Sequence, residues 1–177
     1  MEQSMSQARE LFTAYNGNLL DMHRAGKINE YKSYEVSKET ENEWFAEMVA
    51  KYTMDLSIRD WDAVTSLRLI SRNYQSSEIV EKLAAFAARN LMSADSIVRC
   101  IYADQMVEII KLHKEAITRE LLLRACKGAI EIFESLSSQP LVIDPGHELG
   151  QLKLKDKRAL NQRVKSSIEE VLGILNQ

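Results

Sequence analysis

The residues of this sequence best suited to metal binding or nucleophilic chemistry are three histidines and two cysteines, and their spacing brings no pair of them together. The chain contains no His-x₃-His, no His-Glu-x-x-His and no Cys-x-x-Cys. A zinc site needs several such ligands that converge, often four residues apart on one helix. We therefore predict no structural metal and no cofactor.

His147 is the histidine to watch, because it lies in the longest irregular segment of the chain, within Asp144-Pro145-Gly146-His147-Glu148. Loops carry functional residues more often than helices do. A Pro-Gly dipeptide between helices is nevertheless first of all a turn. We interpret the segment as a turn and keep His147 as a candidate interaction or catalytic residue.

The other histidines and the cysteines have simpler interpretations. His113 stands in the last turn of an expected helix, where the helix dipole favours a positive charge. Cys100 and Cys126 each lie within an apolar helical pattern, which is typical of buried thiols in a reducing compartment. No Gly-x-Ser-x-Gly, Gly-rich phosphate loop or Gly-x-Gly-x-x-Gly occurs, so no motif supports an enzyme.

Charge is concentrated in two segments of opposite sign. Residues 35–47 carry five glutamates against Lys38. A basic run near the C-terminus, with Asp156 as its only acid, is the candidate interaction surface: Lys153, Lys155, Lys157, Arg158, Arg163 and Lys165. There are two interpretations of these segments. Either they pair with each other, within the fold or across a dimer, or both are solvated faces, which is the commonest outcome. Nucleic-acid binding ranks lower, because the net charge is −3 and no aromatic residue interleaves the run.

Length and composition suit a single domain that spans residues 1–177. Apolar residues make up 45% of the chain and charged residues 28%, which supports a folded core and argues against disorder. No stretch approaches the roughly 20 apolar residues that cross a bilayer. The first residues have neither a basic nor an apolar region, so we expect no signal peptide, no membrane association and a cytoplasmic location.

The fold that must position these residues is all-α. Both prolines, Pro140 and Pro145, lie in one short stretch, and apolar residues recur with helical spacing before and after it. We read residues 26–37 as a connector. Capping-box spacing at Thr40 and Glu43, and at Ser57 and Asp60, marks two helix starts. The pattern predicts about seven amphipathic helices, at residues 4–25, 38–55, 58–73, 77–91, 95–113, 116–137 and 155–176.

A possible repeat relates residues 78–87 to residues 120–129, which match at a constant offset of 42. The segment from Asp95 to Ala103, with Asp95 before the pair Val98-Arg99, is similar to the second part of a HEAT unit. Residues 57–137 thus resemble HEAT or armadillo-like repeats, although the proline expected in the first helix is absent. The resemblance implies antiparallel helix hairpins stacked as a short α-α superhelix, and an irregular helical bundle is the alternative.

On this interpretation residues 1–56 form N-terminal helices, residues 57–137 two hairpins packed side by side, and residues 138–177 a loop and a last helix. We expect Leu83 and Leu122 to be buried. The best functional class is a non-catalytic scaffold that binds a partner protein or associates with itself. The alternatives are a small nucleic-acid binder that uses the basic C-terminal helix, and an enzyme with an unrecognised helical site.

Overall fold

The computed structural model describes all of residues 1–177 and is all-helical, with no strand. It contains nine α-helices and two short 3₁₀ helices, two more α-helices than the sequence pattern predicts. The elements are α1 (Glu2–Ala14), α2 (Leu19–Arg24), α3 (Ile28–Ser33), α4 (Lys38–Met54), α5 (Asp62–Ser71), α6 (Ser77–Asn90), η1 (Leu91–Ser93), α7 (Ser96–His113), α8 (Arg119–Ser138), η2 (Leu149–Leu152) and α9 (Lys157–Leu175).

The prediction of one helix over residues 4–25 is wrong, because α1 ends at Ala14 and α2 begins at Leu19. Gly17 has a φ of +69°, a conformation that L side chains rarely adopt. A Cβ at Gly17 would also lie 2.3 Å from the ring of Phe45. A new helix starts immediately after it, because the Asn18 side chain accepts hydrogen bonds from the backbone N–H groups of Leu20 and Asp21.

The connector expected at residues 26–37 contains α3, which is held by tertiary packing. Tyr31 is buried and donates a hydrogen bond of 2.7 Å to Oε1 of Glu41 on α4. Its ring packs with Phe12, whose ring in turn contacts those of Trp44 and Phe45. Six residues are too few to show a helical period, so the sequence pattern did not reveal this helix.

Both predicted capping boxes are wrong. The N-cap of α4 is Ser37 and not Thr40. The Ser37 side chain accepts a hydrogen bond from the backbone N–H of Thr40. α5 begins at Asp62 rather than near residue 58, and no side chain caps it. The N-caps of α7, α8 and α9 follow the usual chemistry, with Asp95, Thr118 and Asp156 each accepting from a backbone N–H in the first turn, whereas the Ser76 side chain does not cap α6.

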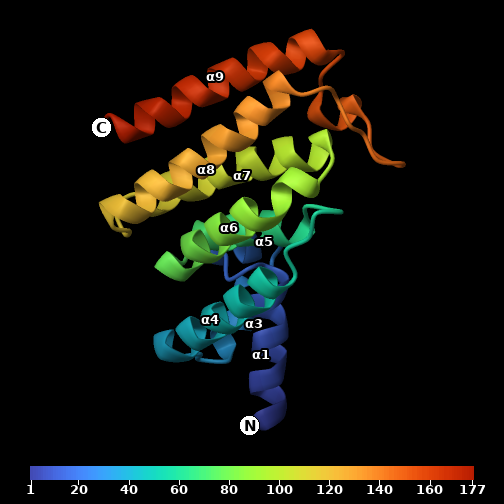
Figure 1. Cartoon of the computed structure of the whole chain (residues 1–177). Coiled ribbons are helices and arrows are strands. Elements are labelled where there is room, and N and C mark those ends of the chain that lie inside the picture. Colours follow the sequence, from blue (N-terminus) through green and yellow to red (C-terminus); the bar gives the residue numbers. More distant parts are fainter.

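The later helices pack in two rows, as Figure 1 allows the reader to follow. One row joins α4 to α6 and α6 to α8, and the other joins α5 to α7 and α7 to α9. α7 contacts helices of both rows and is buried along most of its length, so it is the central helix of the core. The acidic α4 and the basic α9 lie toward opposite ends of the molecule, so they do not pair within the fold.

Positions that are 42 residues apart in α6 and α8 share burial as well as residue type. Five positions of α6 and the five that follow 42 residues later in α8 are all buried, namely Ile79, Val80, Leu83, Ala84 and Ala87, with Leu121, Leu122, Ala125, Cys126 and Ala129. The predicted burial of Leu83 and Leu122 is therefore confirmed. The expectation of two equivalent hairpins is not met, because α8 packs extensively on α7 whereas α6 makes few contacts with the short α5.

We expect truncation of either buried leucine to destabilise the fold strongly. Leu83→Ala and Leu122→Ala should each lower the free energy of unfolding by ~2–5 kcal/mol, because each leaves a cavity in the core. Urea denaturation would measure the loss. Glu81→Ala and Lys127→Ala, on the exposed faces of the same helices, are the controls and should change stability by less than about 0.5 kcal/mol.

Candidate functional site

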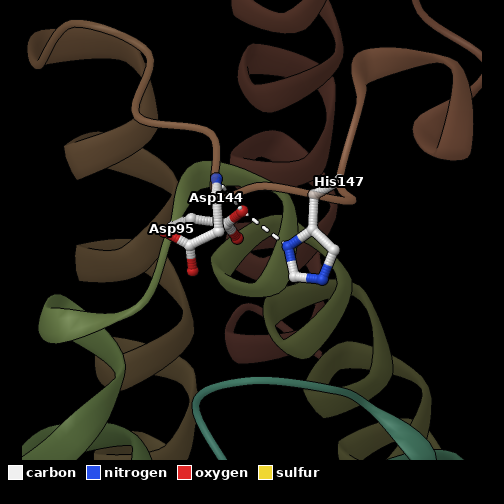
Figure 2. Close-up of side chains that lie close together, drawn as sticks. All are labelled: Asp95, Asp144 and His147. Atoms are coloured by element: carbon white, nitrogen blue, oxygen red, sulfur yellow. Dashed lines mark hydrogen bonds and ion pairs between the residues drawn. The ribbon is translucent and has the colours of Figure 1, made fainter.

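The most connected polar group in the structure is the carboxylate of Asp95, at the N-terminus of α7. Asp95 is 2% exposed, and its Oδ1 accepts a hydrogen bond of 2.8 Å from the backbone N–H of Val98. Its Oδ2 accepts from the backbone N–H of Asp144 at 2.9 Å and lies 2.7 Å from Nδ1 of His147 (Figure 2). The structure therefore joins the predicted residue His147 to a partner 52 positions away in the chain.

The same junction fixes the loop that contains His147. The backbone N–H of Ser96 donates to the carbonyl of Val142, and the Val142 N–H donates back to Oγ of Ser96, at 2.7 and 3.0 Å. The ring of His147 lies against Trp61, with centroids 5.4 Å apart. Residues 139–148 are thus tied to both α7 and the segment before α5.

The chemistry open to this junction is limited by its hydrogen bonds. Burial raises the pKa of Asp95, but the hydrogen bonds from Val98, Asp144 and His147 outweigh burial and hold the pKa below its usual value. With the Asp95 carboxylate beside Nδ1, the imidazole exposes Nε2, as in the orienting pairs of acid–base catalysis.

A metal ion is poorly suited to the same place. One ligand atom each from Asp95, Asp144 and His147 lies within 4.8 Å of the others, which is close enough for coordination. Oδ2 of Asp95, however, already accepts two hydrogen bonds, and the positive end of the helix dipole disfavours a cation at this position. We interpret the junction as a structural tie for the loop.

The end of α8 is held by two buried or half-buried cations. Arg99 is 3% exposed and donates from Nη1 to Oγ of Ser135 and Oε1 of Gln139, at 3.2 and 3.1 Å. Nζ of Lys157 donates to the carbonyl oxygens of Leu136 and Gln139. Burial lowers the pKa of both Arg99 and Lys157. Lys157, predicted as an interaction residue, therefore caps the C-terminus of α8.

Arg163 also serves the fold. Its Nη2 pairs with the carboxylate of Asp104 on α7, and its Nη1 donates to the carbonyl of Leu152 at 3.1 Å. The rest of the basic run, Lys153, Lys155, Arg158 and Lys165, is exposed. The structure thus separates the six predicted residues into two that hold the fold and four that face solvent.

His113 is buried rather than placed to interact with solvent or the helix dipole. Its Nδ1 lies 2.9 Å from the carbonyl of Ile109, and its Nε2 accepts a hydrogen bond of 3.2 Å from the backbone N–H of Ser76. Burial lowers its pKa, so the ring is neutral and links α7 to the start of α6. Cys100 and Cys126 are both free and buried, and burial raises the pKa of Cys100 to about 12.

A groove between α6 and α8 is a second candidate site, which the sequence pattern did not reveal. It encloses about 350 Å³. We call it the α6–α8 groove and define it by its lining residues, which are Ala84, Ala85, Ala88, Arg89, Arg124, Lys127, Gly128 and Glu131. The small side chains and the cations come from the two matched helices of the 42-residue offset.

Comparison of the chain with protein-family models, with curated proteins and with solved structures gives no match. No helix is both long and apolar enough to cross a bilayer. The junction at Asp95 and the α6–α8 groove are accordingly interpreted from their own geometry.

We expect Asp95→Ala to destabilise the protein by about 2 kcal/mol or more, because the variant loses a helix cap and leaves N–H groups without an acceptor. Thermal or urea unfolding would measure the change. Hydrogen exchange at the amides of Val142 and Asp144 should also become faster. Asp144→Ala is the matched control, since only its backbone N–H serves the junction, and its stability should change by less than about 0.5 kcal/mol. Equal stability of the two variants would contradict this role.

Proposed function

We propose that this chain is a non-catalytic protein-interaction module whose α6–α8 groove receives a segment of a partner protein. The observation that supports the proposal is the combination of small side chains and exposed cations along one hollow. Ligand and partner sites are concave, and a few polar groups in them fix orientation.

The small residues of the groove allow a partner backbone to approach closely. Ala85 and Ala88 of α6 are exposed, and Gly128 of α8 is half-buried opposite them. A Cβ built at Gly128 meets only Cε of Met106, at an ordinary 3.8 Å, so a Cβ is tolerated there, and a longer side chain would narrow the groove that Gly128 lines. This room makes Gly128 the best position at which to test the proposal.

The charge of the groove favours a partner segment that carries carboxylates. Arg89, Arg124 and Lys127 are exposed, and the groove has one acid, Glu131, with a carboxylate oxygen 4.0 Å from Nζ of Lys127. The lining therefore carries a net positive charge within a chain whose net charge is negative. Complementary charge raises the rate of association and suppresses wrong partners.

The proposal extends to the architecture that presents the groove. We infer a short α-α superhelix with HEAT-like character in its middle part, supported by the two rows of helices and by the matched burial in α6 and α8. The unequal hairpins leave an irregular bundle as the alternative. Free, buried cysteines fit a cytosolic protein, which we include in the proposal.

A photo-reactive residue placed at Ala88 should cross-link a discrete partner in native lysate, whereas the same residue at the exposed Ala50 of α4 should not. Gly128→Leu should reduce cross-linking at least about tenfold, because it narrows the groove while raising helix propensity. Gly173→Leu is the matched control on α9, where nothing lies within 4 Å of a Cβ. Cross-linking that persists in Gly128→Leu, or that is equal at Ala50, would refute the groove as the site.

Nucleic-acid binding by the basic C-terminal helix ranks second, and we predict none near physiological salt. The relevant test variant is Lys155→Glu with Lys165→Glu, because both side chains are exposed, whereas Arg163 holds the fold. Electrophoretic mobility shifts at two salt concentrations would measure binding. A complex that weakens steeply with salt and is lost in the double variant would reverse the ranking, since phosphate contacts release counterions. An enzyme with His147 at its centre ranks third.

A further inference from the structure

A pocket of about 210 Å³ lies toward the end of the molecule opposite α9, between the start of α2, the first two turns of α4 and the turn that follows α5 (Figure 1). It shares no residue with the α6–α8 groove. α2 contributes Leu19 and Leu20, and α4 contributes Lys38 and Glu41. The pocket thus combines two apolar side chains with an ion pair from a separate helix.

The carboxylate of Glu41 is held by the fold but keeps one oxygen for a ligand. Its Oε1 accepts the hydrogen bond from the Tyr31 hydroxyl. Burial and this hydrogen bond raise the pKa of Tyr31, so the phenol keeps its proton and remains the donor. Oε2 of Glu41 accepts no hydrogen bond, is not sealed from solvent, and lies 3.5 Å from Nζ of Lys38. Because the Lys38 side chain is itself exposed, a ligand ammonium can reach the same oxygen.

Lys38 is a weak partner for this carboxylate. Its side chain is 75% exposed, whereas that of Glu41 is 12% exposed. An ion pair with an exposed lysine contributes little, because solvent screens the charges and a long side chain must be ordered. A ligand ammonium that also covers apolar surface can therefore replace Lys38 at Oε2.

The two leucines supply apolar surface that the fold leaves uncovered. Leu19 and Leu20 are both exposed, and their backbone is fixed because the Asn18 side chain caps α2. Alkyl chains that end in an ammonium lie along apolar surface and keep the charged end at a polar group. Adjacent exposed leucines beside a fixed carboxylate suit a ligand of this kind.

The charge around the pocket also favours a cation. Of the five glutamates in residues 35–47, only Glu41 and Glu47 have an ion-pair partner. The others, Glu35, Glu39 and Glu43, outweigh the positive end of the α4 dipole, which is equivalent to about half an elementary charge. The field of this acidic segment therefore attracts a cation.

We propose that this pocket binds the ammonium group of an unbranched alkyl chain, with the ammonium on Oε2 of Glu41 and the chain along Leu19 and Leu20. A lysine side chain of a partner protein and a free alkylamine share this chemistry. The volume suits a ligand of a few carbon atoms. This site does not rest on the α6–α8 groove, and either proposal stands if the other fails.

Titrations followed by amide NMR shifts test the proposal on the full chain. n-Pentylamine carries both an ammonium and an alkyl chain, ammonium chloride supplies only the charge, and 1-pentanol supplies only the chain. We expect n-pentylamine to bind at least about tenfold more tightly than either, with shifts at residues 17–20 and 38–45. No shift at these residues up to about 10 mM n-pentylamine, or equal binding of 1-pentanol, would overturn the proposal.

A fourth probe, Nα-acetyl-lysine methylamide, distinguishes the two sources of the ligand. It presents the same ammonium at the end of a side chain that is attached to a peptide unit. If it binds more tightly than n-pentylamine, the site belongs to a lysine of a partner protein. If n-pentylamine binds more tightly, the site belongs to a free amine. Both results support the ammonium contact, and binding of neither probe refutes it.

Two variants of the ion pair should change the affinity in opposite directions. Glu41→Gln keeps an oxygen acceptor for Tyr31 but removes the charge, so it should weaken n-pentylamine at least about tenfold. Lys38→Gln removes the competing ammonium and should tighten binding about threefold. Glu39→Gln, an exposed glutamate of α4 outside the pocket, is the matched control and should change the affinity less than about twofold, because salt screens it. Equal loss in Glu39→Gln and Glu41→Gln would contradict the assignment.

A variant of the apolar wall leaves the core untouched. Leu20→Ser replaces an exposed side chain, and it should weaken n-pentylamine about fivefold while binding of the ammonium ion stays the same. Circular dichroism spectra would show that each variant is folded. An unchanged affinity for n-pentylamine in folded Leu20→Ser or in folded Glu41→Gln would refute the corresponding contact and with it the proposal.

Discussion

The carboxylate of Asp95 joins two parts of the fold that are far apart in the sequence. It caps α7, the central helix, and holds the loop that leads from α8 to α9. Because this loop fixes where η2 and α9 begin, a pocket that Asp104 lines between α7 and α9 depends on a hydrogen-bonding group that is not part of it. The helix dipole and three hydrogen bonds stabilise the negative charge, which is why a fully buried carboxylate is tolerated here.

The helical periodicity predicts the long helices well and the short ones poorly. The predicted bounds of α4, α6 and α7 lie within one residue of those observed, because each has a long apolar stripe between polar turns. The break at Gly17 depends on the ring of Phe45, and α3 depends on a hydrogen bond between Tyr31 and Glu41. Both are tertiary contacts, which a local pattern does not contain.

The sites were less predictable, because their residues come from separate segments. His147 stood out in the sequence as a loop histidine, but nothing in the sequence linked it to Asp95. The basic run was visible as a cluster of charge, yet its members have different roles. Lys157 and Arg163 face carbonyl and carboxylate oxygens of α7, α8 and η2, and this assignment requires the packing of α9. A helical wheel of α9 separates the buried face of this helix from its exposed face, but it does not identify the oxygen atoms that Lys157 and Arg163 contact.

The hollows on the surface of this fold follow from one feature of helix packing. Neighbouring helices in a row leave a hollow wherever the facing side chains are small or irregularly spaced. Between α6 and α8 the small residues Ala85, Ala88 and Gly128 leave a shallow, open groove, which suits a chain segment. Between α7 and α9 the inserted η2 leaves a pocket with polar walls. α9 packs extensively on α8, which is one wall of the groove, so the position of α9 bears directly on the shape of the groove.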